Sequence, residues 1–359
     1  MKKLVFLLSA AYDSHYLKKV YACKNNGYDV DVYGFQRDFN LANRIVDEVV
    51  VLGYVQNKNY IKRIGTVYKS INNVIDLYDD NAVFYATTFD IAMVCMVRNV
   101  RYIYGISDIV HSSFPKYLRS IFIWLDQKII RSSCFTVLTS PAFVDYLRLD
   151  SDNKKKCIYL LNKLDISFKN RPRPLIKRYN GSIVIGYVGN IRYPNSILRL
   201  SEIVGLKYPN IKFLYFGNGN KQILDIVNNQ CRQFANVEYM GPFRNPEDLD
   251  SIYAQIDIVA CNYDTTTINE RLLEPNKLYE SLFYSKPIIV AKNTYLAERV
   301  IDIGCGIITD NSEQDIIRIL SSIDENVINN KSAAARKVET TDLIESYDMF
   351  FKRLDKVLR

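Results

Sequence analysis

Residues 274–290 read EPNKLYESLFYSKPIIV, a helix that begins at a proline and a β-branched run that follows it directly. Pro275 suits the first turn of a helix, where its missing N–H costs nothing. Leu278 and Leu282 are spaced four apart and can face a sheet, while 288–290 has the composition of a buried parallel strand. A helix joined to such a strand is typical of α/β proteins.

The same alternation of short apolar runs and amphipathic helices extends along the chain. It fills residues 1–165, stops over 166–180, where two prolines and five basic residues occur, and then starts again. Strands separated by helices imply right-handed crossovers and a parallel sheet, and 359 residues exceed what one core usually serves. We therefore expect an α/β protein with two doubly wound, Rossmann-like domains at 1–165 and 181–341, a linker at 166–180, and a C-terminal helix at 342–359 for which the first domain is a candidate docking site.

The composition is that of a folded protein, with 48% hydrophobic and 24% charged residues. The N-terminal run LVFLLSA is short and a second strand-like run soon follows, so we interpret it as a buried strand rather than a signal peptide. No apolar run approaches the roughly 18 residues that span a bilayer. Seven scattered cysteines without a C-x-x-C pair and only two histidines indicate free thiols and no metal framework. These features predict a cytoplasmic protein.

The net charge of +8 lies mainly in the first half and the linker. A basic face indicates an anionic partner, such as membrane lipid, a phosphorylated acceptor or nucleic acid. Segments 60–71 and 114–131 mix Lys and Arg with Tyr, Phe, Ile and the only tryptophan, Trp124. Both are candidates for peripheral contact with the inner face of the cell membrane. The alternative is that they are core helices with solvated basic edges.

Glycine turns follow two predicted strands of the second half. Gly189 ends one strand shortly before Arg192, and Gly217 and Gly219 end the next. A glycine lets the backbone approach a ligand, and arginine binds phosphate oxygens bidentately; the alternative is a tight turn with a solvated arginine. Gln222 stands where a dinucleotide fingerprint has its third glycine, which argues against an NAD site.

Two helix entrances complete the predicted site. In MGPFRNPEDL we expect Asn245 to be the N-cap of a helix over 246–255, in a loop that could grip a base. In the stretch quoted first, the backbone N–H groups of Asn276, Lys277 and Leu278 form an anion site at a positive helix end. A carboxylate at Glu280 could accept both hydroxyls of a ribose. The alternative is an exposed glutamate paired with a lysine.

The run NKLYESL followed by KPIIV resembles the nucleotide-sugar-binding helix of GT-B glycosyltransferases, the group 1 type of bacterial surface-polysaccharide biosynthesis. GYVGNIR, FGNG and GPF occur in the order which that family shows. The resemblance covers the second half by motif and the first half by architecture. It implies the GT-B architecture, two domains facing a central cleft, and transfer of a hexose-type sugar from a nucleotide diphosphate sugar, with UDP-sugar favoured, to a glycan acceptor that is lipid-linked.

The resemblance also implies roles for particular residues. Glu280 would bind the ribose hydroxyls, Arg192 the diphosphate, and the backbone of 276–278 the distal phosphate. Phe243 and Arg244 would lie by the base. The family stabilises the leaving diphosphate with basic side chains and helix dipoles, so no metal and no further cofactor are implied.

One departure from the family pattern leaves the stereochemistry open. Many retaining members have a second glutamate eight residues before the ribose-binding one, and here that position is Leu272. Glu270 and Glu274 are near but out of register. The D-V-D at 29–31 imitates a metal-binding motif of the other glycosyltransferase fold, but it lies at the start of a strand, so we do not interpret it as a metal site.

An inverting transfer needs a general base in the first domain that takes the proton of the acceptor hydroxyl. The candidates are Asp108, Asp13, His15 and His111. Asp108 is favoured because it follows a strongly strand-like run; its alternative role is the N-cap of the next helix. For both histidines the alternative is a helix-start or core role.

Two other functions remain open on the sequence. A sugar-nucleotide epimerase of the same fold would share the donor half but needs several acid/base residues around the sugar. A basic nucleic-acid-binding protein would explain the charge, but it would leave the strand–helix alternation and the anion-site helix unexplained. We therefore expect no nucleic acid among the partners.

Overall fold

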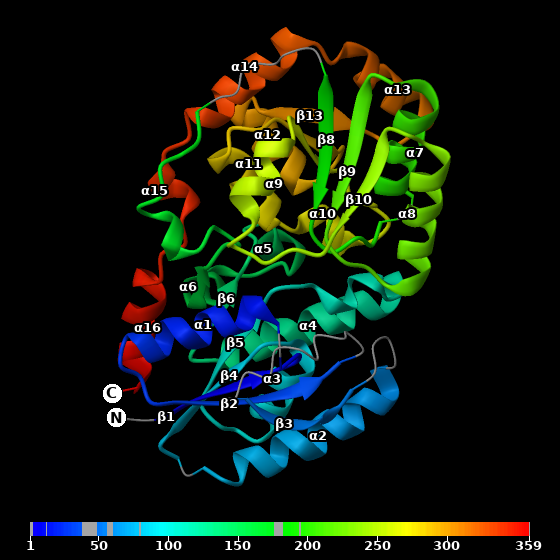
Figure 1. Ribbon diagram of the computed structural model, residues 1–359. Coiled ribbons are helices and arrows are strands. Elements are labelled where there is room, and N and C mark those ends of the chain that lie inside the picture. The colour runs from blue at the N-terminus through cyan, green and yellow to red at the C-terminus, as the bar shows by residue number, and fades with distance from the viewer. Residues whose placement is uncertain are drawn as a thin grey trace. The chain divides into compact units, whose positions relative to one another are not determined.

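The computed structural model describes residues 3–11, 13–37, 49–55, 60–78, 80–175, 182–193 and 195–358. It divides into two compact units: unit 1 comprises Met1–Leu161 with Ser346–Arg359, and unit 2 comprises Asn162–Glu345. Each unit is a parallel sheet flanked by helices (Figure 1). The predicted α/β class with two Rossmann-like domains is therefore confirmed.

Unit 1 contains a seven-stranded parallel sheet in the order β3-β2-β1-β4-β5-β6-β7. The strands are β1 (Lys3–Leu8), β2 (Val30–Gln36), β3 (Val50–Tyr54), β4 (Ala82–Ala86), β5 (Tyr102–Ile106), β6 (Phe135–Leu138) and β7 (Cys157–Tyr159). The helices are α1 (Ser14–Asn25), α2 (Tyr60–Ile75), α3 (Phe89–Val97), the 3-10 helix η1 (Val110–Ser113), α4 (Lys116–Ser132), α5 (Phe143–Tyr146), α6 (Ser151–Lys156) and α16 (Asp348–Leu358). Strand β1 pairs with both β2 and β4, so the strand order reverses there, and ligands of open α/β sheets bind beyond the carboxyl ends at such a reversal.

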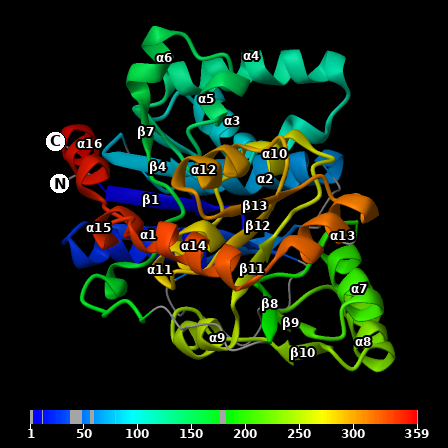
Figure 2. The ribbon, with the colours of Figure 1, turned by 90° about the horizontal axis from the view of Figure 1, so that it is seen from above.

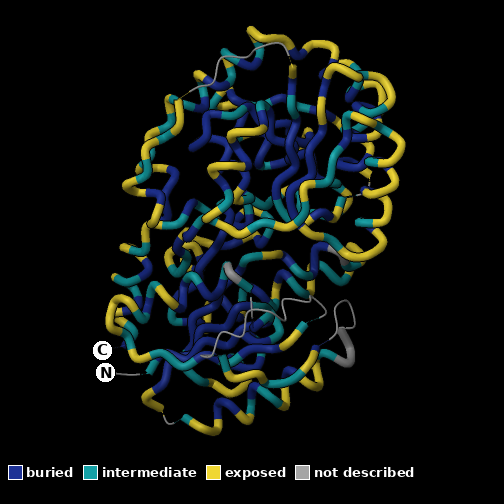
Figure 3. The backbone as a smooth tube through the Cα atoms, viewed as in Figure 1, coloured by how far each residue is buried: buried dark blue, intermediate teal, exposed yellow. Residues whose placement is uncertain are grey.

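The core of unit 1 includes the last helix of the chain. Strands β4 and β5 are buried along their whole length (Figure 3). Phe350, Leu354 and Leu358 of α16 belong to the same buried cluster as the apolar side chains of β1, β4 and β6. The ring of Phe350 lies 5.9 Å from that of Phe135. Helix α16 is thus part of the core of unit 1.

Unit 2 contains a six-stranded parallel sheet in the order β10-β9-β8-β11-β12-β13, with the reversal between β8 and β11. The strands are β8 (Ile183–Val188), β9 (Ile211–Phe216), β10 (Val237–Gly241), β11 (Ile258–Cys261), β12 (Ile288–Ala291) and β13 (Gly306–Thr309). The helices are η2 (Ile166–Phe168), α7 (Ile197–Lys207), α8 (Lys221–Gln233), α9 (Leu249–Gln255), α10 (Ile268–Leu272), α11 (Asn276–Phe283), α12 (Tyr295–Ile303), α13 (Glu313–Ser322), α14 (Glu325–Arg336) and α15 (Thr340–Leu343). Helices α7 and α8 lie along β9 and β10 (Figures 1 and 2).

Residues 162–175, which we expected at the end of the first domain and in the linker, belong to unit 2. The ring of Phe168 lies 5.0 Å from that of Phe283. The guanidinium of Arg173 donates hydrogen bonds to backbone carbonyls of α11 and α14, among them Leu282 at 2.6 Å. These contacts fix the segment on unit 2. Residues 176–180 of the expected linker lie outside the described residues.

The C-terminal segment also differs from the single helix expected over 342–359. Helix α15 ends at Leu343, and α16 starts at Asp348. Between them the N–H of Glu345 donates to the carbonyl of Leu164 at 2.9 Å. This pairing replaces the hydrogen bonds that would continue the helix. Among the described residues, none of the helices has the length and apolarity of a membrane span.

Candidate functional site

Two turns at the carboxyl end of the unit 2 sheet are so tight that only glycine fits. Gly189 and Gly217 have φ angles of +129° and +141°. A Cβ on Gly217 would lie 1.9 Å from the carbonyl oxygen of Gly189. At Gly219 the nearest atom to such a Cβ is the carbonyl oxygen of Ile191, at 3.0 Å. The structure thus brings these three predicted glycines together where the strand order reverses.

The side chain of Lys277 reaches the turn at Gly189. Its Nζ would be only 2.9 Å from a Cβ on Gly189, and the residue is 9% exposed. The ammonium donates a hydrogen bond to the hydroxyl of Tyr263 at 3.1 Å. It also lies 4.7 Å from the ring centre of Tyr187 and 5.3 Å from that of Tyr263. A cation is therefore buried at the sheet edge among phenol rings.

The charge of Lys277 is only partly compensated. Burial lowers the pKa of its ammonium, and the nearby charge of Arg192 lowers it further, against Cys261 and Glu280, which raise it. An ammonium has three donors, and the one hydrogen bond it makes within the described residues goes to Tyr263. A buried charge without an ion-pair partner is costly. The arrangement favours an incoming anion.

Glu280 is buried on α11, so the alternative interpretation, an exposed glutamate paired with a lysine, is wrong. One carboxylate oxygen accepts a hydrogen bond from the hydroxyl of Tyr253 at 2.7 Å. Burial raises the pKa of Glu280, while the hydrogen bond from Tyr253, the charge of Lys277 and the side chain of Asn245 lower it. The residues of α11 from Lys277 to Phe283 are all buried. The carboxylate is thus held in one place.

The entrance of α11 differs from the prediction in two details. Pro275 has an extended conformation, with a φ of −82° and a ψ of 157°, and caps the helix instead of lying in its first turn. The N–H of Leu278 donates to the carbonyl of Pro275 at 3.1 Å. The N–H of Leu278 is therefore not available to a ligand. The predicted anion site is then limited to the N–H groups of Asn276 and Lys277.

The loop after β10 also begins its helix later than expected. Asn245 and Pro246 are joined by a cis peptide bond, and α9 starts at Leu249 with Asp248 at its N-cap. Arg244 is exposed, and its guanidinium pairs with Asp248 at 2.9 Å. Phe243 is half-buried. Asn245 therefore does not cap the helix, and its side chain lowers the pKa of Glu280.

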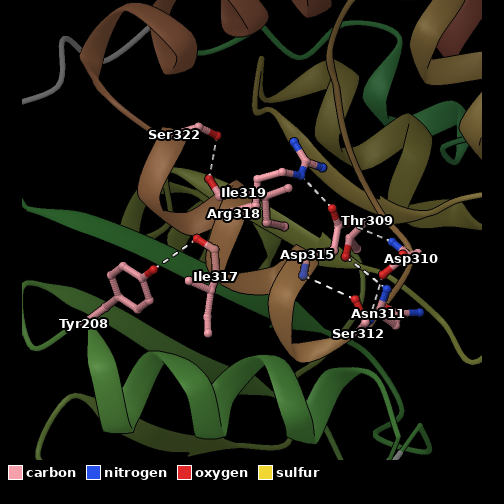
Figure 4. A network of polar contacts seen from close by, with 10 residues as sticks. All are labelled: Tyr208, Thr309, Asp310, Asn311, Ser312, Asp315, Ile317, Arg318, Ile319 and Ser322. Carbon is pink, nitrogen blue, oxygen red and sulfur yellow. Dashed lines mark hydrogen bonds and ion pairs between the residues drawn. The ribbon is translucent and has the colours of Figure 1, made fainter.

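Aromatic residues that the sequence analysis did not single out form the walls of the site. The rings of Tyr193 and Tyr263 stack with centres 4.4 Å apart. The side-chain amide of Asn311 donates to the carbonyl of Tyr263 at 3.2 Å. Figure 4 shows the network around Asn311, where its N–H bonds to Thr309 and Ser312 caps α13. The signal available in the sequence is that both tyrosines closely follow strands, Tyr193 after β8 and Tyr263 after β11.

Glu270 and Glu274, which are near the position of the family's second glutamate but out of register, have structural roles of their own. Glu274 accepts a short hydrogen bond from the hydroxyl of Tyr279 and lies 3.7 Å from the Nε of Arg299. Glu270 is in the first turn of α10, which Thr267 caps, and Leu272 ends that helix. The D-V-D motif is paired as well, since Lys3 lies 3.2 Å from Asp29 and 3.1 Å from Asp31. Within the described part of the chain, no cluster of His, Cys, Asp and Glu is arranged to hold a metal.

In unit 1 the structure brings together three of the predicted base candidates. Asp13 caps α1 by accepting the N–H of His15 at 2.9 Å, and the Nε2 of His15 lies 3.2 Å from the hydroxyl of Ser107. Asp108 is exposed directly after that serine. Both carboxylates act on Tyr16, whose pKa is raised, chiefly by burial. The loops after β1 and β5 thus meet at the carboxyl edge of the sheet.

His15 differs from Asp108 in its electrostatic surroundings. The Nζ of Lys19 lies 2.8 Å from the Nε2 of His15, and an ammonium can only donate, so Nε2 accepts. Burial and the charges of Lys19 and Lys18 hold the pKa of His15 well below its ordinary value. The imidazole is neutral, but its lone pair is engaged. Asp108 is not a helix cap, because η1 begins after Ile109.

His111 has the core role that was its alternative interpretation. Its Nε2 lies 2.7 Å from Asp126, which also accepts the hydroxyl of Tyr104 at 2.8 Å. The imidazole stacks on Phe122 and Tyr146, with centres 5.9 and 5.7 Å apart. This network is buried.

No protein-family model and no curated protein matches the sequence of this chain. Solved structures do match it in three dimensions. HepE from Anabaena, in complex with UDP and glucose, superposes with a TM-score of 0.67 at 15% identity, over 99% of this chain and 100% of HepE. WaaG, a glycosyltransferase involved in lipopolysaccharide biosynthesis, gives 0.64 at 13% over 95% of this chain and 97% of WaaG. A Listeria monocytogenes protein assigned as a UDP-N-acetylglucosamine 2-epimerase gives 0.62 at 10% over 95% and 93%. The chain therefore has the GT-B fold, as the order of its motifs predicted.

Proposed function

We propose that this protein is a glycosyltransferase that moves a hexose-type sugar from a nucleotide diphosphate sugar, with UDP-sugar favoured, to a glycan acceptor. The observation that carries the proposal is the buried ammonium of Lys277 beside the turn of Gly189, which packs on that of Gly217. This cation has N–H donors that make no hydrogen bond within the described residues, and it lies at the carboxyl edge of the sheet, where nucleotides bind. The GT-B fold, which HepE uses with UDP and glucose, supports the same function.

In this proposal unit 2 holds the donor. Lys277 and Arg192 bind the diphosphate, together with the N–H groups of Asn276 and Lys277 at the start of α11. Glu280, fixed by Tyr253, accepts the ribose hydroxyls, and Phe243 and Arg244 lie by the base. As the bond to the sugar breaks, negative charge grows on the leaving diphosphate, and the two cations stabilise it. No metal is needed for that step.

Unit 1 supplies the acceptor site and, for an inverting transfer, the base. Asp108 is exposed, follows β5 and lies near Asp13 and His15, whereas the lone pair of His15 is engaged by Lys19. We assign the base role to Asp108 on that ground. The acceptor is a lipid-linked glycan of surface-polysaccharide synthesis, and 60–71 and 114–131 contact the cytoplasmic face of the membrane.

The experiment that tests the function measures products from a panel of UDP- and GDP-sugars by chromatography. A transferase releases nucleotide diphosphate and free sugar slowly without an acceptor. The epimerase, which the similarity to the Listeria protein favours as the second candidate, converts the donor to an isomer without releasing the nucleotide. If the protein neither hydrolyses nor isomerises any donor, and shows no thermal shift with UDP, it is neither a transferase nor an epimerase.

A further inference from the structure

A pocket of about 260 Å³ lies in unit 1 between α2, α3, η1 and α4. Its walls are mainly aliphatic and aromatic side chains, among them Val67, Met93, Val94, Val110, Phe114 and Phe122. Helix α3 and η1 follow the carboxyl ends of β4 and β5, which is the edge where open α/β sheets bind ligands. None of these residues belongs to the donor site.

The charged groups and the imidazole in the wall of this pocket are already paired. The Nε of Arg63 lies 2.7 Å from the carboxylate of Asp90. His111 is engaged by Asp126 at 2.7 Å and by the hydroxyl of Tyr146 at 3.3 Å. A polar ligand would have to break these contacts, whereas an apolar one would not. The pocket is therefore built for a hydrocarbon group.

The pocket opens to solvent through an apolar rim. Ile64, Tyr68 and Val97 line it and are 60%, 49% and 61% exposed. On the neighbouring α4, Ile121 and Trp124 are 53% and 51% exposed. An exposed apolar rim that leads into an apolar pocket is typical of a binding surface.

The charge around the opening is positive. Among the residues of α2 whose side chains the structure describes, the basic ones are Arg63, which pairs with Asp90, and Lys69, and none is acidic. Helix α4 contains Lys116, Arg119, Lys128 and Arg131, of which Arg131 pairs with Asp150 at 2.9 Å. Its single acid, Asp126, is buried against His111. Such a surface attracts an anionic headgroup and leaves the chain attached to it beside the pocket.

We propose that this pocket binds the hydrocarbon chain of an anionic lipid, with the headgroup on the basic faces of α2 and α4. The volume accommodates a segment of one chain and not a whole lipid. The inference goes beyond the transfer reaction, because it does not depend on the donor. Only the identification of that lipid as the lipid-linked acceptor rests on the proposed function.

A chain-length series of alkyl phosphates, titrated by calorimetry below their micelle concentrations, tests the pocket directly. We expect one binding site, with affinity rising up to about fourfold per methylene and then levelling off when the pocket is full. Decyl phosphate should bind more tightly than decanol. Affinity that rises without levelling off, or several weak sites, overturns the pocket in favour of interfacial contact. Equal binding of decanol overturns the anionic headgroup.

Matched variants locate the binding. Val97→Glu places a charge on the rim and should weaken decyl phosphate binding at least tenfold, while Leu206→Glu, on α7 and also 61% exposed, should not. Vesicles of phosphatidylglycerol with brominated acyl chains should quench Trp124, the only tryptophan, less in Val97→Glu than in Leu206→Glu. Equal behaviour of the two variants overturns the proposal. UDP affinity is measured in both, so that failure of the donor site and failure of this pocket are told apart.

Discussion

The ammonium of Lys277 occupies a place that would be unfavourable in an empty protein, since it is buried and has a lowered pKa. Its position was not visible in the sequence, where only its backbone N–H was assigned a role. The path of a lysine side chain depends on what surrounds it, here Tyr187 of β8 and Tyr263 after β11, and these come from distant parts of the chain. The place of Glu280 on α11 could be predicted, because it depends on the helix alone, whereas its burial could not.

We predict that Lys277→Met weakens UDP binding by about 10- to 150-fold, the loss expected for hydrogen bonds to a charged group. The variant should be as stable as the wild type or more so, because it removes a buried, unpaired charge. Calorimetry with UDP and urea unfolding measure the two effects. Lys207→Met, at an exposed lysine that pairs with Glu313, serves as the control. Unchanged UDP affinity in Lys277→Met contradicts the assignment.

The same side chain makes UDP binding depend on pH. The folded protein holds the pKa of Lys277 below its ordinary value of 10.5, so the cation is lost at a lower pH than that of a solvated lysine, as the pH rises through the lowered pKa. UDP affinity should therefore fall as the pH rises through that pKa, and Lys277→Met should remove this part of the dependence. A bound anion favours the charged form, so UDP binding there should also take up a proton.

We predict that Asp108 is needed for sugar transfer but not for UDP binding. Asp108→Asn removes the group that would accept the acceptor's proton and should lower transfer by about 100-fold or more, with UDP affinity unchanged. Asp76→Asn, at another exposed carboxylate of unit 1, is the control. Turnover at the wild-type rate in Asp108→Asn removes it as the base and leaves Asp13 as the remaining carboxylate candidate.

The strands are predicted from the sequence better than the helix ends and the contacts between loops. Alternating apolar runs located every strand of both sheets, because buried parallel strands have a strong signal. Helices α10 and α14 were not predicted as separate helices. Helices α9 and α16 begin later than expected, because local hydrogen bonds set where they start. The close packing of the glycine turns after β8 and β9 was also invisible, since it joins two loops through backbone atoms.

That packing leads to a prediction for Gly217→Ala. The new methyl would lie 1.9 Å from the carbonyl of Gly189 and would force a φ of +141° on alanine. Gly53→Ala imposes a similar φ, +133°, with nothing within 4 Å, and so isolates the strain of the backbone, about 1–3 kcal/mol. Urea unfolding should show a larger loss for Gly217→Ala, and UDP calorimetry should show loss of binding in that variant alone. Equal losses in the two variants contradict the steric account.

At the level of the domains, the order of the motifs predicted the fold, but the boundaries needed the structure. Residues 162–175 pack on unit 2 because Phe168 and Arg173 find partners there. The last helix joins unit 1, since its apolar face fits the cluster around Phe135. A periodic pattern states that a helix face is buried but not which core receives it.

Phe350→Ala tests that placement. Removing a fully buried ring from the core of unit 1 should cost about 3–5 kcal/mol of unfolding free energy, whereas Met349→Ala, at the next residue, which is 54% exposed, should cost little. Trp124 is the only tryptophan and lies on α4 of unit 1, so its fluorescence in urea reports unfolding of this unit selectively. UDP affinity, which we assign to unit 2, should persist in both variants before unfolding starts. If the Trp124 transition is unmoved in Phe350→Ala, α16 is not part of the core of unit 1, and the chain's end must stabilise another part of the molecule.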